Sequence, residues 1–313
     1  MGAVFSNRPN DIRAIRWWDI IICLAIIISI CWMLPTILKY RSSARYIATM
    51  VVNPKNTDLV NLKFGYWNYT MCHIIALFFV PFAGLFKQSD KTKRKIFYGA
   101  IMILTAVFVL YIAITTTVII MILAALAILF HWNKHYGLLG SAILLVSVIL
   151  LIINIESVVD FMMVNYRNTD MYPKLLDFKD IINGGGSHRH ITLDARADYQ
   201  FGAIQGFLKN PFIGSSYQGS GGHSILLNRL GTTGIIGFIP FALMVFFIFR
   251  QWYKLIPAQS KFYYNLTWVG ILVILYNKNC FGGEGFTFIS VILPCLCLTF
   301  NYPATVFPAN KKN

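Results

Sequence analysis

Long, continuous apolar segments are the feature that most constrains how this chain can fold. Lipid offers the backbone no hydrogen-bond partners, so a helix that crosses a membrane needs about 20 consecutive apolar residues. These segments lack the alternating pattern of barrel strands, and we therefore expect helices. The sequence predicts eight spans: Trp18–Leu38, Tyr69–Phe86, Ile96–Ile114, Val118–Trp132, Leu138–Ile155, Ser224–Phe249, Leu266–Tyr276 with its flanks, and Phe286–Phe300.

The composition agrees with a membrane protein. Of the 313 residues, 57% are hydrophobic and 12% are charged, and the mean hydropathy is +0.62. Soluble domains carry about 25% charged residues, so an ordinary soluble enzyme is excluded, as are a disordered chain and a collagen-like repeat. The sequence predicts an all-α, polytopic membrane protein in which residues 1–313 form one membrane domain.

The basic residues predict how the chain is oriented. There are 27 Lys and Arg residues against 12 Asp and Glu residues, a net charge of +15. In a soluble protein this excess would suggest nucleic acid, but here it indicates either charge sorted to one side of a membrane or an anionic lipid-linked ligand, with membrane lipid and no nucleic acid as a partner. The strongest cluster lies in residues 87–95. We therefore expect that loop and both termini in the cytoplasm, and residues 156–223 on the outer side.

Residues 156–223 form the one long polar segment between predicted spans, and such loops usually carry function. His188 and His190 flank Arg189 within it. No acidic or cysteine partner stands at a spacing typical of a metal site, so we expect no metal and no cofactor.

His223 ends this loop directly after Gly222 and precedes an apolar segment. A helix N-terminus disfavours imidazolium, and a neutral imidazole can accept a proton from a sugar hydroxyl. Gly222 allows a ligand to approach the backbone closely. The alternative, which spacing does not separate from this one, is an interfacial histidine without a catalytic role.

Two arginines of the same loop, Arg189 and Arg196, are candidates for binding phosphate. A guanidinium binds phosphate in a bidentate manner and stays charged in a dry site. The alternative is a surface arginine paired with Asp194 or Asp198. Arg229 lies within the next apolar segment, where a charge is costly unless its side chain snorkels or has a partner, and a functional role is therefore considered for it without assigning it to phosphate.

The order of these residues resembles a known family. Arg196 is followed by Asn210-Pro211-Phe212-Ile213-Gly214, then by His223, then by paired glycines in Leu230-Gly231 and Gly234–Gly237. Over Asp194–Phe249 this arrangement resembles the bacterial O-antigen polymerase and O-antigen ligase family of Wzy/WaaL-type membrane glycosyltransferases. Phe64–Tyr69, just before a predicted span, is also similar to the Gly-aromatic-Asn loop of that family.

The resemblance implies a GT-C-like fold and a metal-independent, inverting glycosyltransferase in the bacterial inner membrane, with its active site on the outer face. Its partners would be a polyprenyl (undecaprenyl) diphosphate-linked glycan and a chain-length regulator. Carried over, His223 is the catalytic base, and Arg196 with Arg189 binds the diphosphate. Asn210, Pro211, Gly214 and Gly222 belong to the substrate loop.

We expect a polysaccharide polymerase of an O-antigen or capsule pathway. One alternative is a ligase that transfers the glycan to the lipid A core, and another is a transporter of lipid-linked oligosaccharide. The chain also departs from the family. Thr115-Thr116-Thr117 stands where members carry a Ser-Arg pair, Arg229 replaces an acidic residue, and one predicted span precedes the Gly-aromatic-Asn loop instead of several. A compact variant and an inactive member lacking N-terminal helices are therefore both left open.

Overall fold

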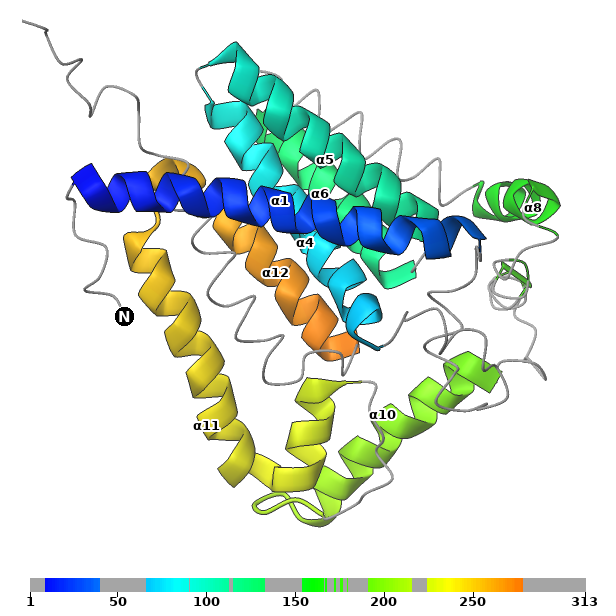
Figure 1. Ribbon diagram of the computed structural model, residues 1–313. Helices are drawn as coiled ribbons and strands as arrows, with labels where there is room; N and C mark the ends of the chain where they lie inside the picture. The colour runs from blue at the N-terminus through cyan, green and yellow to red at the C-terminus, as the bar shows by residue number, and fades with distance from the viewer. Residues whose placement is uncertain are drawn as a thin grey trace, which may run out of the picture.

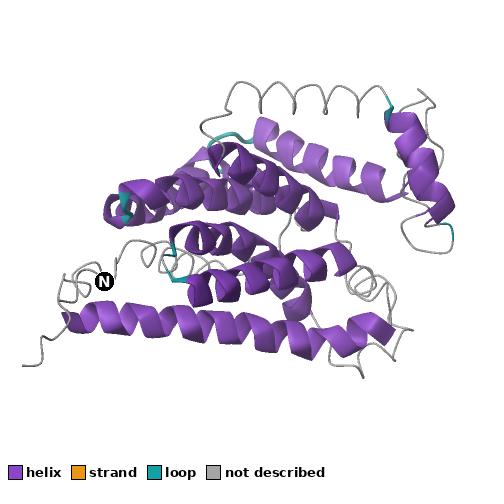
Figure 2. Ribbon diagram, turned by 90° about the horizontal axis from the view of Figure 1, so that it is seen from above, coloured by secondary structure: helices purple, strands orange, loops and turns teal. Residues whose placement is uncertain are grey.

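The computed structural model of the chain describes residues 9–39, 66–89, 91–112, 115–132, 154–165, 191–215 and 224–277, together with 167, 172, 175, 176 and 179. These residues are almost all helical, and no strand occurs among them (Figure 2). The elements are α1 (Pro9–Lys39), α4 (Tyr66–Gln88), α5 (Thr92–Ile112), α6 (Thr115–Trp132), α8 (Ile155–Asn165), α10 (Ile191–Lys209), α11 (Ile225–Leu255), η2 (Ala258–Ser260) and α12 (Lys261–Asn277). The predicted all-α class is thus confirmed for the described part of the chain.

Helix α4 is the centre of the bundle, and α5, α6, α12 and α1 pack around it (Figure 1). In its segment Met71–Gln88, 72% of the residues are buried. His73 lies in this core with no exposed surface, as expected of an interior histidine. Because α4 is apolar on all sides, it suits a position enclosed by other helices.

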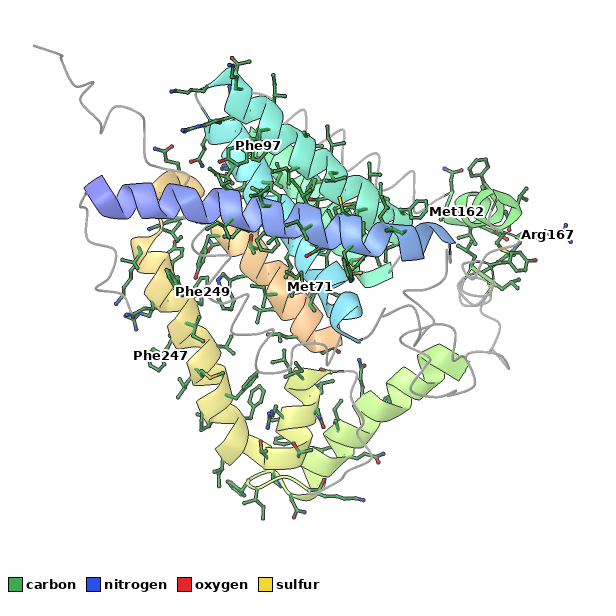
Figure 3. All side chains as sticks on the ribbon, in the orientation of Figure 1. Met71, Phe97, Met162, Arg167, Phe247 and Phe249 are labelled. Carbon is green, nitrogen blue, oxygen red and sulfur yellow. The ribbon has the colours of Figure 1, made fainter. Side chains whose placement is uncertain are left out.

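The outer helices expose apolar side chains. Only 33% of α5 and 6% of α11 is buried, and Ile103, Val107 and Phe247 are each more than half exposed. Figure 3 shows Phe249 on the bundle side of α11 and Phe247 on its outer side. An apolar surface of this extent is unfavourable in water and favourable in lipid, so these helices indicate a membrane protein.

Three helices of the described part are long and apolar enough to cross a membrane, namely Met71–Gln88, Thr92–Ile112 and Ile225–Leu255. Ile20–Pro35 and Thr117–Trp132 are apolar but shorter, and the predicted seventh span lies in α12. The predicted spans Leu138–Ile155, apart from its last two residues, and Phe286–Phe300 lie outside the described residues. The number of eight spans therefore stays a prediction.

One expectation for the connections is wrong. The predicted spans Ile96–Ile114 and Val118–Trp132 leave Thr115-Thr116-Thr117 between them as a connection, but α6 already begins at Thr115. Threonine is readily accepted at the start of a helix, because its hydroxyl can bond to unpaired backbone N–H groups. In addition, residues 156–223, expected as a long loop, include nearly all of α8 and the whole of α10.

Several helix ends that the sequence places in the cytoplasm lie together. The Gln88 amide at the end of α4 donates to the Gln259 carbonyl in η2 over 3.2 Å. The Trp132 indole at the end of α6 donates to the Tyr263 hydroxyl at the start of α12 over 2.7 Å. Figure 3 shows Phe97 of α5 near this end and Met71 near the other. If consecutive helices cross the membrane in opposite directions, their cytoplasmic ends gather at one end of the bundle in this way.

Cysteine labelling tests the predicted orientation. We expect a membrane-impermeant maleimide to label Lys209→Cys in spheroplasts, because α10 belongs to the predicted outer segment. Gln259→Cys should be labelled only after permeabilisation, because Gln259 lies among the basic helix ends. The unsubstituted chain measures labelling of the native cysteines. The opposite labelling pattern would invert the topology.

Candidate functional site

Helix α11 is interrupted at Gly234, where the backbone takes φ 60° and ψ −163°. This conformation is essentially restricted to glycine. The interruption divides the helix into a first limb, Ile225–Thr233, and a second limb, Ile235–Leu255. The second limb alone still has about the 20 residues that a span requires. The sequence predicted one unbroken span from Ser224 to Phe249, and the break corrects that expectation.

The turn Asn210–Gly214 supplies the hydrogen bonds that the break removes. The N–H groups of Ile235 and Ile236 donate to the carbonyls of Pro211 and Phe212 over 2.9 and 3.1 Å. The carbonyl of Gly231 accepts from the Ser215 N–H over 2.9 Å. In an apolar region such partners are required, because an unpaired backbone group there costs several kcal/mol.

Glycines permit the close contact of α11 with α10 and the turn, because at these points the two backbones touch and leave no space for a side chain. A Cβ added to Gly231 would lie 2.5 Å from the Ala203 carbonyl oxygen of α10. A Cβ on Gly234 would lie 2.5 Å from the Gly214 nitrogen, and Gly214 itself has a φ of 73°. Helix α10, the turn and the break of α11 therefore form one rigid unit, which we call the glycine lock: Ala203, Gly206, Asn210–Ser215, Gly231 and Gly234.

Three residues predicted for the substrate loop, Asn210, Pro211 and Gly214, thus belong to the glycine lock. The Asn210 carbonyl accepts from the Gly214 N–H over 2.8 Å and closes the turn. Phe212 and Ile213, in the middle of the turn, are 68% and 70% exposed. The contacts that the structure gives these residues are within the turn, with Gly206 of α10 and with α11, and the role in a substrate loop stays a prediction.

The glycine lock also fixes the register of two candidate positions. Contacts run from Ala203 with Gly231 to Pro211 with Ile235, so α10 and the first limb point the same way along the chain. Arg196 precedes Ala203 by seven residues, and Ser224 precedes Gly231 by seven, about 10 Å in a helix. Position 196 lies on the same face of α10 as Ala203, because seven residues are close to two full turns. The two helices diverge toward these N-terminal ends (Figure 1).

The predicted catalytic histidine stands next to a helix cap. The Ser224 hydroxyl accepts from the Leu227 N–H over 3.2 Å and caps α11, so His223 precedes the cap rather than opening the helix. Serine is favoured at this position because it satisfies a first-turn donor. His223, Gly222 and Arg189 lie outside the described residues, as does the side chain of Arg196. Arg229 is exposed on the first limb.

An apolar cavity lies between the second limb of α11 and α12. Its volume is about 600 Å³, within the range typical of ligand pockets. Leu226 of the first limb, Phe241 and Val245 of the second limb, and Trp268 and Leu272 of α12 line it. The cavity follows the second limb from Phe241 to Tyr253, and its lining also includes Leu226 of the first limb.

Sequence reasoning missed the α10 side of the glycine lock. Ala203 and Gly206 are small residues three positions apart, a pattern that allows close helix packing. That pattern was available, but nothing local indicated that its partner would be Gly231. No family model, curated protein or solved structure matches the chain.

Replacing Gly231 by alanine tests the glycine lock. We expect Gly231→Ala to lower stability by about 1–3 kcal/mol, because the methyl group meets backbone that cannot move aside. Gly270→Ala in α12 is the matched control, since its Cβ would meet only the end of the Leu77 side chain at 2.8 Å. The measurement is the melting midpoint of the detergent-purified protein. Equal midpoints for the two variants would contradict the lock.

Proposed function

We propose that the chain is a polysaccharide polymerase of the O-antigen or capsule type. It transfers a growing glycan from a polyprenyl diphosphate to the next lipid-linked repeat unit. The observation that carries the proposal is the register set by the glycine lock. Arg196 and the residue after His223 both stand seven positions before the contact of Ala203 with Gly231. Arg196 and Ser224, 28 positions apart in sequence, thereby belong to the same end of one helix pair, and His223 directly precedes Ser224 in the chain.

In this proposal the two residues divide the chemistry. His223 accepts the proton of the acceptor hydroxyl, and that oxygen attacks the anomeric carbon. The bond from this carbon to the diphosphate oxygen breaks, and the configuration at the carbon inverts. Arg196, assisted by Arg189, stabilises the negative charge that develops on the leaving diphosphate. Because α10 and α11 diverge toward these ends, substrate rather than direct contact would connect the two residues.

The cavity supports a lipid-linked donor. A polyprenyl diphosphate needs an apolar channel in the membrane, and the cavity extends from Leu226 of the first limb along the second limb to Tyr253. Its lining is almost entirely apolar and aromatic, which suits an isoprenoid chain. A water-soluble nucleotide sugar has no apolar chain that could fill such a cavity. The cavity thus favours a donor whose carrier stays in the membrane.

The position of the candidate site along α11 supports chemistry on the outer face. Ser224 begins α11, whereas Lys254 lies in its last turn, near η2 and the basic ends of α4 and α5. If the basic ends are cytoplasmic, the second limb leads from there to the glycine lock on the opposite side. Outer-face glycan assembly on a polyprenyl carrier requires this placement.

Complementation tests the two catalytic roles. In a strain of the source organism lacking this gene, the wild-type chain should restore long glycan chains on a gel. We expect His223→Ala to give single repeat units, because removing a general base costs about 10²–10⁴ in rate. Arg196→Ala should fail in the same way, and Arg196→Lys should recover only part of the activity, because lysine keeps the charge but loses the bidentate geometry.

Lys209→Ala is the control for Arg196→Ala, since Lys209 is an exposed cation at the other end of α10. It should leave chain length unchanged, with all variants present in the membrane at equal levels. Wild-type chain length in the His223→Ala variant would refute the base role. Long chains that accumulate on the polyprenyl carrier in the null strain and reach lipid A only with the wild-type gene would identify a ligase instead.

Filling the cavity tests the carrier chain. We expect Ala242→Trp to shorten the glycan chains, because Ala242 lines the cavity and an indole would occupy it. Leu243→Trp places the same side chain on the next residue, which is 47% exposed and outside the lining. It should retain full activity. Equal activity in both variants, at equal protein levels, would show that the cavity does not bind the carrier chain during the reaction.

A further inference from the structure

One end of the bundle gathers basic side chains from distant parts of the sequence. The bond from Gln88 to Gln259 joins the end of α4 to η2, between α11 and α12. Helix α5 begins four residues after Gln88. The eight cations brought together here define what we call the basic face: Lys87, Lys91, Lys93, Arg94, Lys95, Arg250, Lys254 and Lys261.

The charges of the basic face are not balanced by the residues that the structure describes. None of the eight forms an ion pair within that part of the chain, where the pair Lys179–Asp160 is found. Lys87 and Lys261 lie over the rings of Trp132 and Tyr253, at 5.6 and 4.6 Å from the ring centroids. Seven of the eight side chains are exposed. A surface of this charge attracts anions.

The charges at the start of α5 are unfavourable for the dipole of that helix, whose N-terminal end is itself positive. Lys93, Arg94 and Lys95 occupy its first turn, which contains no acidic residue. Cations are favoured at the C-terminal end of a helix, as Lys87 of α4 and Lys254 of α11 are. An external anion at the start of α5 would remove this unfavourable arrangement.

The neighbouring residues identify the kind of anion. Helix α5 is itself long and apolar enough to span the membrane, and Ile96 and Phe97, which follow the cations, are 66% and 41% exposed. Cations followed directly by exposed apolar side chains match the boundary between lipid headgroups and acyl chains. Lipid phosphates lie at this boundary.

We propose that the basic face binds the headgroups of anionic phospholipids in the bilayer. The first turn of α5 holds the phosphate groups, and Ile96 and Phe97 contact the upper acyl chains. Basic groups next to a membrane attract anionic lipid in proportion to their number, and this attraction falls with salt. The proposal stands independently of the glycosyltransferase activity.

The test is lipid titration of the detergent-purified full chain, followed by native mass spectrometry. We expect phosphatidylglycerol to bind more tightly than phosphatidylcholine, with a preference that weakens at high salt. Lys93→Gln with Arg94→Gln should weaken phosphatidylglycerol binding by about tenfold or more and leave phosphatidylcholine binding unchanged.

Lys209→Gln with Arg229→Gln removes the same charge from exposed positions of α10 and α11 and is the matched control. It should keep wild-type affinity for phosphatidylglycerol. Wild-type affinity in the Lys93/Arg94 variant, or an equal loss in both variants, would overturn the proposal. Melting midpoints without added lipid verify folding, and Lys91→Gln with Lys95→Gln replaces the first variant if that one unfolds.

Discussion

Backbone hydrogen bonding in an apolar environment is the constraint on which this structure depends. A helix satisfies it automatically, and an interrupted helix does not. At Gly234 the ladder of α11 opens, and the turn after α10 supplies two acceptors and one donor in its place. The break, the turn and α10 therefore exist together. The break without the turn would leave polar backbone groups of α11 unpaired.

The same interruption shapes the space around the candidate site. The two limbs of α11 meet at Gly234, and the cavity lies between the second limb and α12, with Leu226 of the first limb also in its lining. Ser224 caps the first limb at its N-terminal end. The conformation of Gly234 thus sets the direction in which the first limb, and with it Ser224, lies relative to the cavity.

Much of the fold could be predicted from the sequence because lipid imposes a simple rule. Continuous apolar segments predicted helices that correspond to α4, α5, α6, α11 and α12. The break in α11 was missed, because Gly234 does not lower the hydropathy of its segment and its partners lie about 20 residues away. Hydropathy records which residues prefer lipid. It does not record which backbone groups are bonded to distant segments.

The candidate site, like the fold, was only partly predictable from the sequence. The residue types of Arg196 and His223 indicated phosphate binding and proton transfer. Their separation of 27 residues in the sequence did not predict how far apart they lie in space. The register of position 196 relative to Ser224 came from Gly231 of α11, which the sequence presented only as part of a motif, and from Ala203, which it did not single out. Small residues carry no reactive group that would mark them in a sequence, yet they determine how closely two helices approach.

The two proposals meet in the position of the chain relative to the bilayer. A diphosphate attached to a polyprenyl chain stays near the membrane surface, so an enzyme that uses it must hold its base and its arginine at a matching height. The second limb of α11 connects the candidate site to the basic face as one apolar helix. Lipid phosphates bound at the basic face would fix the depth of that helix at one surface, and thereby fix the height of the site at the other. In the proposed enzyme, anion binding at this surface would then serve the same end as the glycine lock, since both would keep the N-terminal ends of α10 and α11 at the height of the diphosphate.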